Sequence, residues 1–273
     1  MAIANVIPQV WSTRLQENMK KFMVFGSLCN RNYEGDIAHW GDTVSINTRN
    51  DITVKAYNPA NEIDDPEQLS GTDTTLVIDH GAYYNFFIND ADAAQARTDL
   101  IDAAMRNAAY RLATDAESYI LDVIRSGAGT KTEHPMPAIN SIELYELLLD
   151  IKTAFDQKGV PIHDRKLIIP PALGAMLLAN IRLVIGMDAT ANRIAEGSVA
   201  RALGFDIYTS LDLNDELVAM IPDAVTFANQ ITKLEAYRPE KGFADGMQGL
   251  CLSGAKVVFP SAVYFCHLMT SPQ

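Results

Sequence analysis

The sequence predicts an α+β fold, and three observations lead to this prediction. Apolar residues alternate with polar ones in an early segment and again near the C-terminus, which is typical of half-buried strands. Between these segments lies a long stretch in which apolar residues recur every three or four positions, as on one face of a helix. A further region mixes short strands with helices. Strands and helices grouped in separate runs are typical of the α+β class.

Residues 1–32 are predicted to form an N-terminal arm. The apolar residues of its first half are spaced as in a short amphipathic helix or in a segment that lies on another surface. Terminal segments fray unless something holds them, so an arm of this composition is expected to pack against a second surface. The apolar positions are Ile3, Val6, Ile7, Val10, Trp11 and Leu15.

Residues 33–89 are predicted to form a long β-hairpin. Its two limbs, "DTVSINTRNDITVKAY" and "TTLVIDHGAYYNFFIND", alternate apolar and polar residues, and the segment between them is rich in turn residues. The turn is acidic, because six Asp or Glu and no Lys or Arg occur from Asn58 to Asp79. An isolated two-stranded hairpin is only marginally stable in water, so the distal part is expected to lie on a neighbouring subunit.

Residues 91–126 are predicted to form one long helix that ends at "SGAG". No Pro or Gly interrupts the pattern, and about 36 residues at ~1.5 Å each extend about 54 Å. The apolar stripe of this helix is narrow and rich in alanine. Another element is therefore expected to pack closely along it.

Residues 139–230 are predicted to form a separate α/β region that is inserted into the chain. Asn140 and Glu143 have the spacing of a capping box, which opens a helix that Gly159 and Pro161 end. The strands "RKLIIPP", "FDIYTS" and "ELVAMIP" and the helix "ALGAMLLANIR" lie in the rest of this region. Residues 90–138 and 231–273 flank the insertion and are expected to meet in space.

The composition argues against several classes of protein. The net charge of −12 and the pI of about 4.8 do not suit a chain that grips nucleic acid, since phosphate binding needs clustered Lys and Arg. No apolar run is long enough to cross a bilayer, and the N-terminus lacks a signal-peptide pattern, so a soluble intracellular product is expected. The three cysteines, Cys29, Cys251 and Cys266, are expected to be buried and reduced.

The sequence predicts no catalytic, cofactor-binding or metal-binding residues. "SGAGTKT" resembles a phosphate-binding loop, but its order of residues is wrong and it follows a helix. "SGAK", from Ser253 to Lys256, has the SxxK spacing without the partner motifs and is interpreted as a turn between two strands. The five histidines show no metal-binding spacing. Three polar residues of "GFDIYTSLDL" have no base close in the sequence: Asp206, Ser210 and Asp212.

The order of these elements resembles that of the major capsid proteins of tailed bacteriophages, which have the Hong Kong ninety-seven type fold. The N-terminal "NVIPQVWSTRLQENMKKFMVFGSLCNRNYEGDI", together with "GDTVSINT", is similar to the openings of one group in this family. "GFDIYTSLDL" is similar to its axial-domain strand, and "FANQITKLEAYRPEKGFADGMQGLCLSGAKVVFPSAV" to its closing peripheral strands. The likeness covers nearly the whole chain.

The resemblance implies a division of the chain into four parts. These are an N-terminal arm at 1–32, an extended hairpin loop at 33–89, a peripheral domain and an axial domain at 139–230. The peripheral domain combines residues 90–138 and 231–273 and contains a spine helix at 91–126. In this division Gly204 to Ser210 is a structural strand of the axial domain.

The resemblance also implies a structural protein that is not an enzyme. Such a subunit assembles with itself through hexamers and pentamers into an icosahedral shell that encloses the phage genome and contacts double-stranded DNA non-specifically. It is found in the virion after assembly in the host cytoplasm, with a separate scaffolding protein and a portal as partners and no membrane or cofactor. Because the arm is short, no maturation cleavage is expected, and no pattern supports a crosslink between Lys55 and Asn229.

The acidic tip of the hairpin, from Glu62 to Glu67, is predicted to rest against basic residues of an adjacent subunit. Exposed ion pairs contribute on the order of 1 kcal/mol or less each, but a closed shell repeats them. The candidate partners are Arg14, Lys20, Lys21, Lys152, Lys158, Arg165 and Lys166.

Two alternatives to a phage shell stay open at this point. An encapsulin-type nanocompartment shell has the same fold but usually begins with an amphipathic helix that docks cargo, whereas this arm runs through Pro8 toward the hairpin. An α+β enzyme with a split site belongs to a different class, and the failed catalytic motifs argue against it. Closed shells or rings in micrographs support a shell subunit, whereas a compact monomer that a ligand stabilises supports the enzyme.

Overall fold

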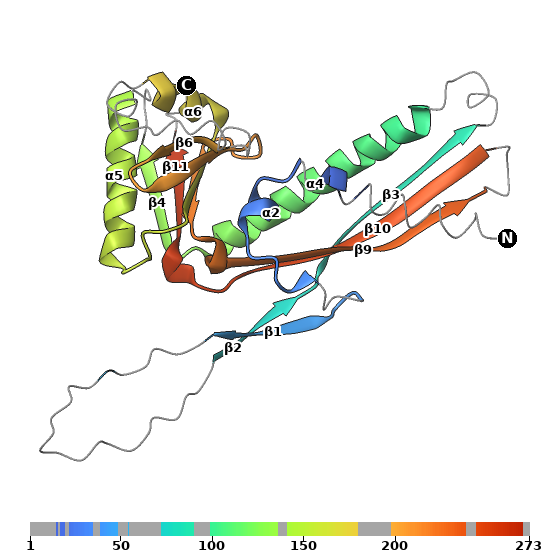
Figure 1. The fold of residues 1–273 in the computed structure, drawn as a ribbon, viewed down its shortest axis with the longest axis horizontal. Coiled ribbons are helices and arrows are strands. Elements are labelled where there is room, and N and C mark those ends of the chain that lie inside the picture. Colours follow the sequence, from blue (N-terminus) through green and yellow to red (C-terminus); the bar gives the residue numbers. More distant parts are fainter. Residues whose placement is uncertain are drawn as a thin grey trace, which may run out of the picture.

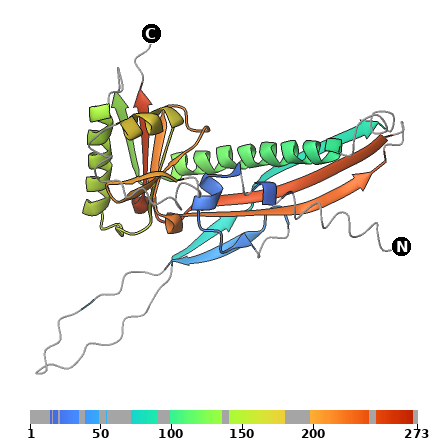
Figure 2. The same cartoon turned by 45° about the horizontal axis from the view of Figure 1, so that its top comes forward.

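The computed structural model confirms the α+β class. It describes residues 15, 17–19, 22–34, 39–48, 54, 72–89, 99–135, 141–179, 198–238 and 244–269. A compact unit of helices and strands lies at one end, a long helix and long strands extend from it, and a hairpin projects away from both (Figure 1). The same three parts are distinct after a 45° rotation (Figure 2).

The helices and strands of the described residues differ widely in length. The helices are α2 (Phe25–Leu28), α4 (Asp99–Gly127), α5 (Ser141–Gln157), α6 (Pro171–Ala179) and the 3-10 turns η2 (Pro222–Ala224) and η3 (Pro260–Ala262). The strands are β1 (Thr43–Thr48), β2 (Thr72–Val77), β3 (His80–Asn89), β4 (Thr130–Pro135), β5 (Arg165–Ile169), β6 (Ser198–Ala202), β7 (Phe205–Thr209), β8 (Glu216–Met220), β9 (Val225–Tyr237), β10 (Ala244–Val257) and β11 (Val263–Met269).

The hairpin predicted from residue 33 onward exists as the antiparallel pair β1 and β2, in register from Thr43 opposite Val77 to Thr48 opposite Thr72. Alternation gives this pair one apolar face, and that face is buried against the long strands. The buried side chains of the contact are Val44, Ile46, Leu76, Ile78, Ala228 and Leu252. The acidic tip predicted between the limbs lies outside the described residues.

The prediction that the second limb of the hairpin continues to residue 89 is wrong beyond Asp79. Residues 80–89 do not continue the hairpin but form β3, which pairs antiparallel with β10 from His80 opposite Ser253 to Asn89 opposite Ala244. Backbone hydrogen bonds from Gly41 to the Ile78 carbonyl and from Ile78 to the Asp42 carbonyl close the hairpin at its base. The alternation of residues 83–88 specified a strand correctly, but it carried no information about which strand would be its partner.

A three-stranded sheet in the order β3-β10-β9 carries the long helix α4 on one face. The prediction of a long helix is confirmed from Asp99 to Gly127, and residues 91–98 lie outside the described residues. The alanine stripe allows the close packing that was expected, because Ala109, Ala113 and Ala116 are all buried. This face of α4 therefore fixes the helix against the long strands.

A six-stranded sheet in the order β4-β11-β8-β5-β7-β6 forms the compact unit together with α5 and α6. The strands predicted within 139–230 are confirmed as β5, β7 and β8, and Gly159 ends α5 in a left-handed conformation with φ +68°. Three strands do not follow the predicted boundaries between the axial and peripheral domains at residues 138 and 231. β4 and β11 join this sheet by parallel and antiparallel pairing, and β9 already begins at Val225.

The "SGAK" motif lies inside β10, so its interpretation as a turn is wrong. Its glycine, Gly254, faces the base of the hairpin: a Cβ added there would meet the backbone carbonyl oxygen of Val77 at 2.5 Å and Ile78 Cδ1 at 2.7 Å. The absence of a side chain at Gly254 thus lets the end of β2 cross β10 closely. The motif is explained by packing and not by chemistry.

Substituting Gly254→Ala is expected to destabilise the protein by about 1–3 kcal/mol, because the added methyl group meets backbone that cannot rotate away. Urea unfolding followed by circular dichroism measures this difference. Lys256→Ala, an exposed position on the same strand, serves as the control and is expected to change stability by less than about 0.5 kcal/mol. Equal midpoints for Gly254→Ala and the parent would contradict the close approach at this crossing.

Candidate assembly surfaces

An open groove of about 760 Å³ runs between the edge strand β3 and the helix α4. Most of its lining is apolar, with polar side chains of α4 along its length. The apolar side chains include Ala82, Tyr84, Phe86, Ala104, Ala108 and Leu112, and the polar ones include Asn107, Arg111 and Asp115. An apolar groove beside an unpaired strand edge is a common docking surface for another chain.

The two flanks of α4 are covered differently. On the side toward β9, Leu15 and Met19 of the N-terminal segment are buried in one cluster with Met105 and Ala109 of the helix. The ring of Phe22 extends this contact by meeting Tyr110 edge to face, with centroids 5.4 Å apart. On the side toward β3, no segment of the described part of the chain fills the corresponding angle between helix and sheet. The groove is this unfilled flank.

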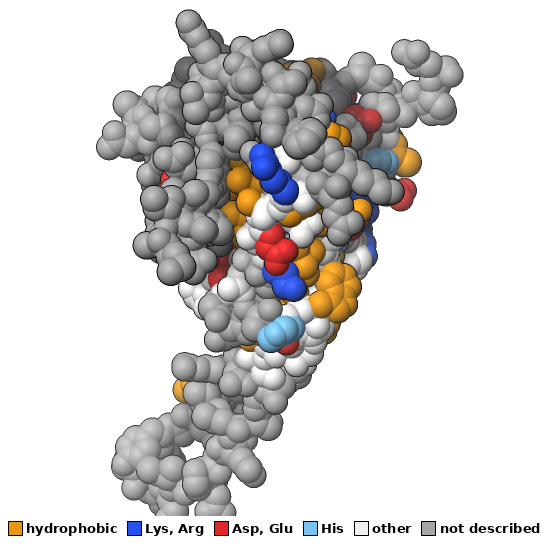
Figure 3. Space-filling view, turned by 90° about the vertical axis from the view of Figure 1, so that its right-hand side faces the viewer, with side chains coloured by type: hydrophobic (Ala, Val, Ile, Leu, Met, Phe, Trp, Pro, Cys, Tyr) orange, Lys and Arg blue, Asp and Glu red, His pale blue; other side chains and the backbone are white. Residues whose placement is uncertain are grey.

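The opposite face of the β3 sheet exposes large aromatic side chains. Tyr83 and Phe87 alternate with the residues that face α4, and 79% and 62% of their surfaces are exposed. Trp40 lies beside Gly81 on this face and is 61% exposed. On the end of the molecule at the right of Figure 1, hydrophobic side chains likewise lie at the surface between a few charged ones (Figure 3). Exposed aromatic groups of this size are typical of surfaces that a partner covers.

Most of the basic residues proposed to meet the acidic tip are used within the chain. Lys152 pairs with Asp156, Lys158 contacts Thr130, and Lys166 pairs with Asp206. Three others lie outside the described residues: Arg14, Lys20 and Lys21.

Arg165 was a wrong candidate for contact with the acidic tip, because only 1% of its surface is exposed. Its guanidinium donates to the carbonyls of Val160 and Pro161 and lies over the rings of Phe155 and Phe205. This side chain therefore stabilises the corner after α5 and is not available to a neighbour.

Two other arginines, which were not among the predicted partners, are better placed to contact the acidic tip of a neighbour. Arg106 and Arg111 are both exposed on α4, five residues apart and therefore on different sides of the helix, and Arg111 lines the groove. Within the described residues, the side chain of neither arginine makes an ion pair or a hydrogen bond. The helical period alone could have found them, because both positions fall off the apolar stripe of the predicted helix.

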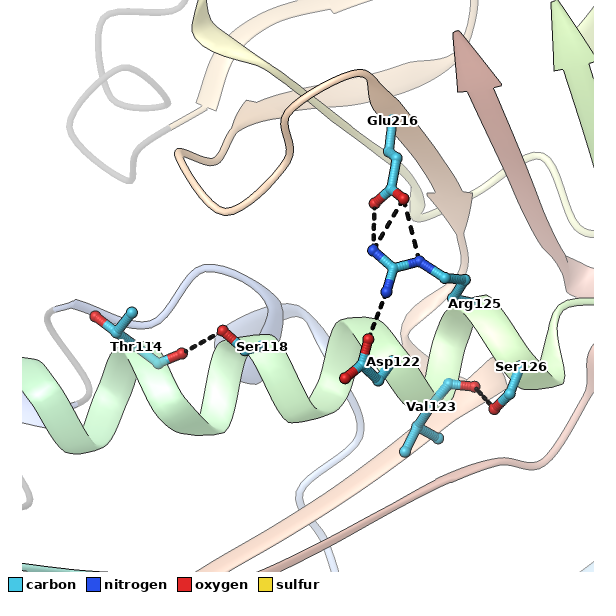
Figure 4. Close-up of polar contacts among 7 residues, drawn as sticks. All are labelled: Thr114, Ser118, Asp122, Val123, Arg125, Ser126 and Glu216. Carbon is cyan, nitrogen blue, oxygen red and sulfur yellow. Dashed lines mark hydrogen bonds and ion pairs between the residues drawn. The ribbon is translucent and has the colours of Figure 1, made fainter. Parts of the chain in front are cut away.

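A forked ion pair ties the last turn of α4 to the compact unit (Figure 4). Arg125 donates from Nη2 to both carboxylate oxygens of Glu216 at 2.9 and 2.8 Å and from Nε to one of them at 3.1 Å. Its Nη1 donates to Asp122 at 2.5 Å. The hydrogen bond with Glu216 raises the pKa of Arg125, opposed by partial burial. This planar pairing fixes the direction of β8 relative to the helix axis.

A buried carboxylate on the same helix holds the N-terminal segment. Glu117 is 1% exposed and accepts hydrogen bonds from the backbone N–H groups of Phe25 and Gly26, both at 2.8 Å. These donors belong to the first turn of α2, whose amides have no partner within that helix. Burial raises the pKa of Glu117 to about 7, opposed by these N–H bonds and reinforced by the negative charge of Asp212.

Two of the polar residues considered for catalysis lie together in one turn. Ser210 and Asp212 hydrogen-bond each other in a turn, since the Asp212 N–H donates to Ser210 Oγ at 3.2 Å. Ser253 is buried whereas Lys256 is exposed, because residues three apart on a strand point to opposite faces. Three cysteines are free and buried, as expected: Cys29, Cys251 and Cys266.

The described residues include no group of His, Cys, Asp and Glu side chains suited to a metal ion. Within the same residues, no helix has both the length and the apolar character needed to cross a membrane.

The pKa of Glu117 predicts a pH dependence of stability. Because its folded pKa lies near 7, above the ordinary value of 4.5, the folded protein binds this proton more tightly than the unfolded chain. The stability from this proton is complete below pH ~4.5 and is lost as the pH rises through ~7, with a slope of up to ~1.4 kcal/mol per pH unit. Glu117→Gln is expected to flatten the slope measured by urea unfolding between pH 5 and 8.

The matched control for this experiment is Glu133→Gln, an exposed carboxylate on β4. It is expected to keep the slope of the parent. A Glu117→Gln protein whose stability follows pH as steeply as the parent would show that another group takes up the proton.

Comparison with known proteins gives a consistent result. A family model described as "Phage capsid protein" matches residues 74–264. No curated protein has a matching sequence. Among solved structures, a Mycobacterium phage Che8 structure is 25% identical and covers 91% of this chain and 92% of that one, with a TM-score of 0.70.

Two further structures share the fold at lower identity. The capsid structure of the cyanophage P-SCSP1u is 16% identical, with a TM-score of 0.69 over 91% of this chain and 89% of that one. The mature capsid of bacteriophage PhiM1 is 12% identical, with a TM-score of 0.66 over 92% and 88%.

Proposed function

The chain belongs to the phage capsid protein family, and from this premise we propose that it builds a closed phage head through hexamers and pentamers. Its fold is the Hong Kong ninety-seven type, and it is a viral structural protein of the icosahedral shell. Family membership supports a location in the virion capsid and self-assembly into a shell. The ring composition, the enclosed genome and assembly in the host cytoplasm are the proposed part.

In this proposal each predicted part of the chain has its own role in the shell. Residues 1–32 act as the arm, the hairpin reaches to a neighbour, and the long sheet with α4 forms the peripheral domain. The compact six-stranded unit acts as the axial domain around the ring centres. The pairing of β4 and β11 with that unit means that the peripheral and axial parts share strands.

The uncovered groove between β3 and α4 is the observation that best supports this proposal. A monomer gains nothing from leaving this apolar flank open, whereas a subunit of a shell can fill it with a neighbour. The hairpin projects from the body and its tip is acidic in sequence, while the exposed Arg111 lines the groove and the exposed Arg106 lies five residues earlier on the same helix. The proposed contact places the tip of one copy, residues 58–71, against these arginines of the next.

The remaining partners are proposed from the family alone. A separate scaffolding protein and a portal would complete the head, and double-stranded DNA would be contacted non-specifically. The net charge of −12 supports weak contact with DNA, since acidic residues outnumber the basic residues that could neutralise phosphates.

The two alternatives receive less support. An encapsulin-type shell is not favoured, because the matching family is one of phage capsid proteins. A virus-like particle from Pyrococcus furiosus shares the fold with a TM-score of 0.57 and 15% identity, which bears on the fold only. An enzyme is less consistent with the family, whose members are structural proteins.

Assembly of the purified chain, alone and with the neighbouring phage head genes, tests the proposal. Negative-stain micrographs of the parent are expected to show closed shells or rings of five and six. Arg106→Glu with Arg111→Glu is expected to raise the protein concentration at which assembly begins by at least about fivefold, the equivalent of ~1 kcal/mol per contact.

Lys256→Glu is the matched control, because it makes the same kind of charge reversal at an exposed position outside the groove. It is expected to assemble like the parent. Normal assembly of the double arginine variant would exclude the proposed contact, and a parent that stays monomeric with every head protein present would exclude the shell function itself.

A further inference from the structure

The strand β3 forms one edge of the three-stranded sheet, and its outer side has no partner strand among the described residues. Its register with β10 runs without interruption from His80 to Asn89. The sequence of β3, "HGAYYNFFIN", contains no Pro and no Asp, Glu, Lys or Arg. Proteins usually protect an exposed edge with charges, Pro or a bulge, because its free N–H and C=O groups can pair with another strand. The edge of β3 carries none of these features.

The other edge of the same sheet, β9, is protected. Its register with β10 shifts between Leu250 and Cys251, so that Thr232 is left out of the pairing as a bulge. Two exposed charged residues, Lys233 and Glu235, follow this bulge. The contrast between the two edges indicates that β3 is the one that accepts another strand.

The groove beside β3 has the length and the chemistry for one added strand. Residues 82–87 of β3 line one side of it, and six residues of a strand extend ~20 Å. The other wall is α4, where the small side chains of Ala104 and Ala108 leave a space of about 760 Å³. A strand added there would place alternate side chains beneath α4 and the others beside the exposed Tyr83 and Phe87.

Residues 51–56 of the hairpin, "DITVKA", have the sequence of such a strand. The apolar Ile52, Val54 and Ala56 alternate with polar residues, and three consecutive positions are β-branched. Val54 is 92% exposed in the single chain, so its apolar surface is available to a neighbour. The N-terminal arm suits the groove less well, because Pro8 interrupts its apolar run and lacks the N–H that a strand pairing needs.

The hairpin corner, Asp79 and His80 between β2 and β3, shows which end of the groove is basic. His80 Nε2 and Asp115 Oδ2 are 2.6 Å apart, so this turn of α4 lies at the beginning of β3. Arg111, one turn before Asp115, lines the groove near the same end. A strand that runs antiparallel to β3 ends there, and the acidic residues 58–71 that follow it are then close to Arg111.

We propose that residues 51–56 of a second copy add to the free edge of β3 as an antiparallel fourth strand. Backbone hydrogen bonds to β3 form the ladder, and the side chains of Ile52, Val54 and Ala56 fill the groove beneath α4. Lys55 lies on the other face, and its charge protects the new edge against further strands. The inference rests on the proposed function and names the segment by which one subunit holds the hairpin of the next.

Disulfide trapping between two differently substituted chains tests the added strand. One chain carries Thr53→Cys and the other carries Asn85→Cys, because paired residues of neighbouring strands have Cβ atoms ~5 Å apart, close enough for a disulfide. Tyr83→Cys and Phe87→Cys replace Asn85→Cys in parallel mixtures, which samples the adjacent registers on the same face. The native cysteines are buried. The chains are mixed with the neighbouring head proteins, oxidised and digested, and mass spectrometry identifies the linked peptides.

The best of the three mixtures is expected to give at least about tenfold more linked peptide than a mixture in which the second chain carries Lys233→Cys. Lys233 is the matched control, because it is an exposed strand position on the protected edge. Adding Val54→Asp to the Thr53→Cys chain is expected to lower the yield at least about fivefold, since a carboxylate would enter the apolar groove. Val54→Thr, which keeps the shape and the strand propensity, is expected to retain the yield. Both variants are expected to fold, because Val54 is exposed.

Equal yields at β3 and at Lys233→Cys, in preparations whose micrographs show shells, would overturn the added strand and leave the proposed function intact. A Val54→Asp chain that is linked as well as its parent would also overturn it. Links to β3 in preparations without shells or rings would support the added strand and contradict the shell function. The absence of both links and shells would overturn both, so the two proposals fail in distinguishable ways.

Discussion

The packing of α4 on β10 is the contact on which the rest of the molecule depends. Small side chains on the helix, among them Ala109, allow the close approach, and the long sheet supplies the apolar surface beneath it. Three other parts of the chain are then attached to residues in the second half of this helix. Glu117 holds the N-terminal segment, Asp115 and Tyr119 hold the hairpin corner, and Arg125 holds β8. The helix therefore sets the relative positions of the parts that would face neighbours.

The sequence predicted the elements of this fold better than their partners. The long helix followed from a period of three to four residues, and β5 and β7 followed from short apolar runs bounded by Pro and Gly. The alternation around Tyr83 also specified a strand correctly. It could not specify the partner, because alternation fixes only which face of a strand is buried, whereas pairing with β10 depends on residues more than 150 positions away. The same reason explains why the sequence did not indicate that β4 and β11 join the six-stranded sheet.

For the candidate surfaces too, the sequence indicated single features but not the residues that they contact. The acidic hairpin tip was evident from the sequence, but Arg165 was a wrong choice as its partner, because its burial requires two rings from separate elements, Phe155 and Phe205. Glu117, by contrast, could have been found. It is a charged residue on the apolar stripe of a predicted helix, between Ala113 and Ile120, and a carboxylate in that position must have buried donors. The groove itself could not have been found, since it is defined by what does not cover β3.

The combination of apolar and polar contacts suits a subunit that would have different neighbours at different positions of a shell. Close-packed apolar contacts have one good geometry and resist gradual change, which suits the helix and sheet that form the rigid body. Hydrogen bonds and ion pairs can reorient by small angles and still be made, and they add to the apolar packing at α2, at the hairpin corner and at β8. The proposed shell, with rings of five as well as six, would place the same hairpin in slightly different surroundings. Polar contacts on a rigid helix are the simplest arrangement that combines a fixed body with adjustable attachments.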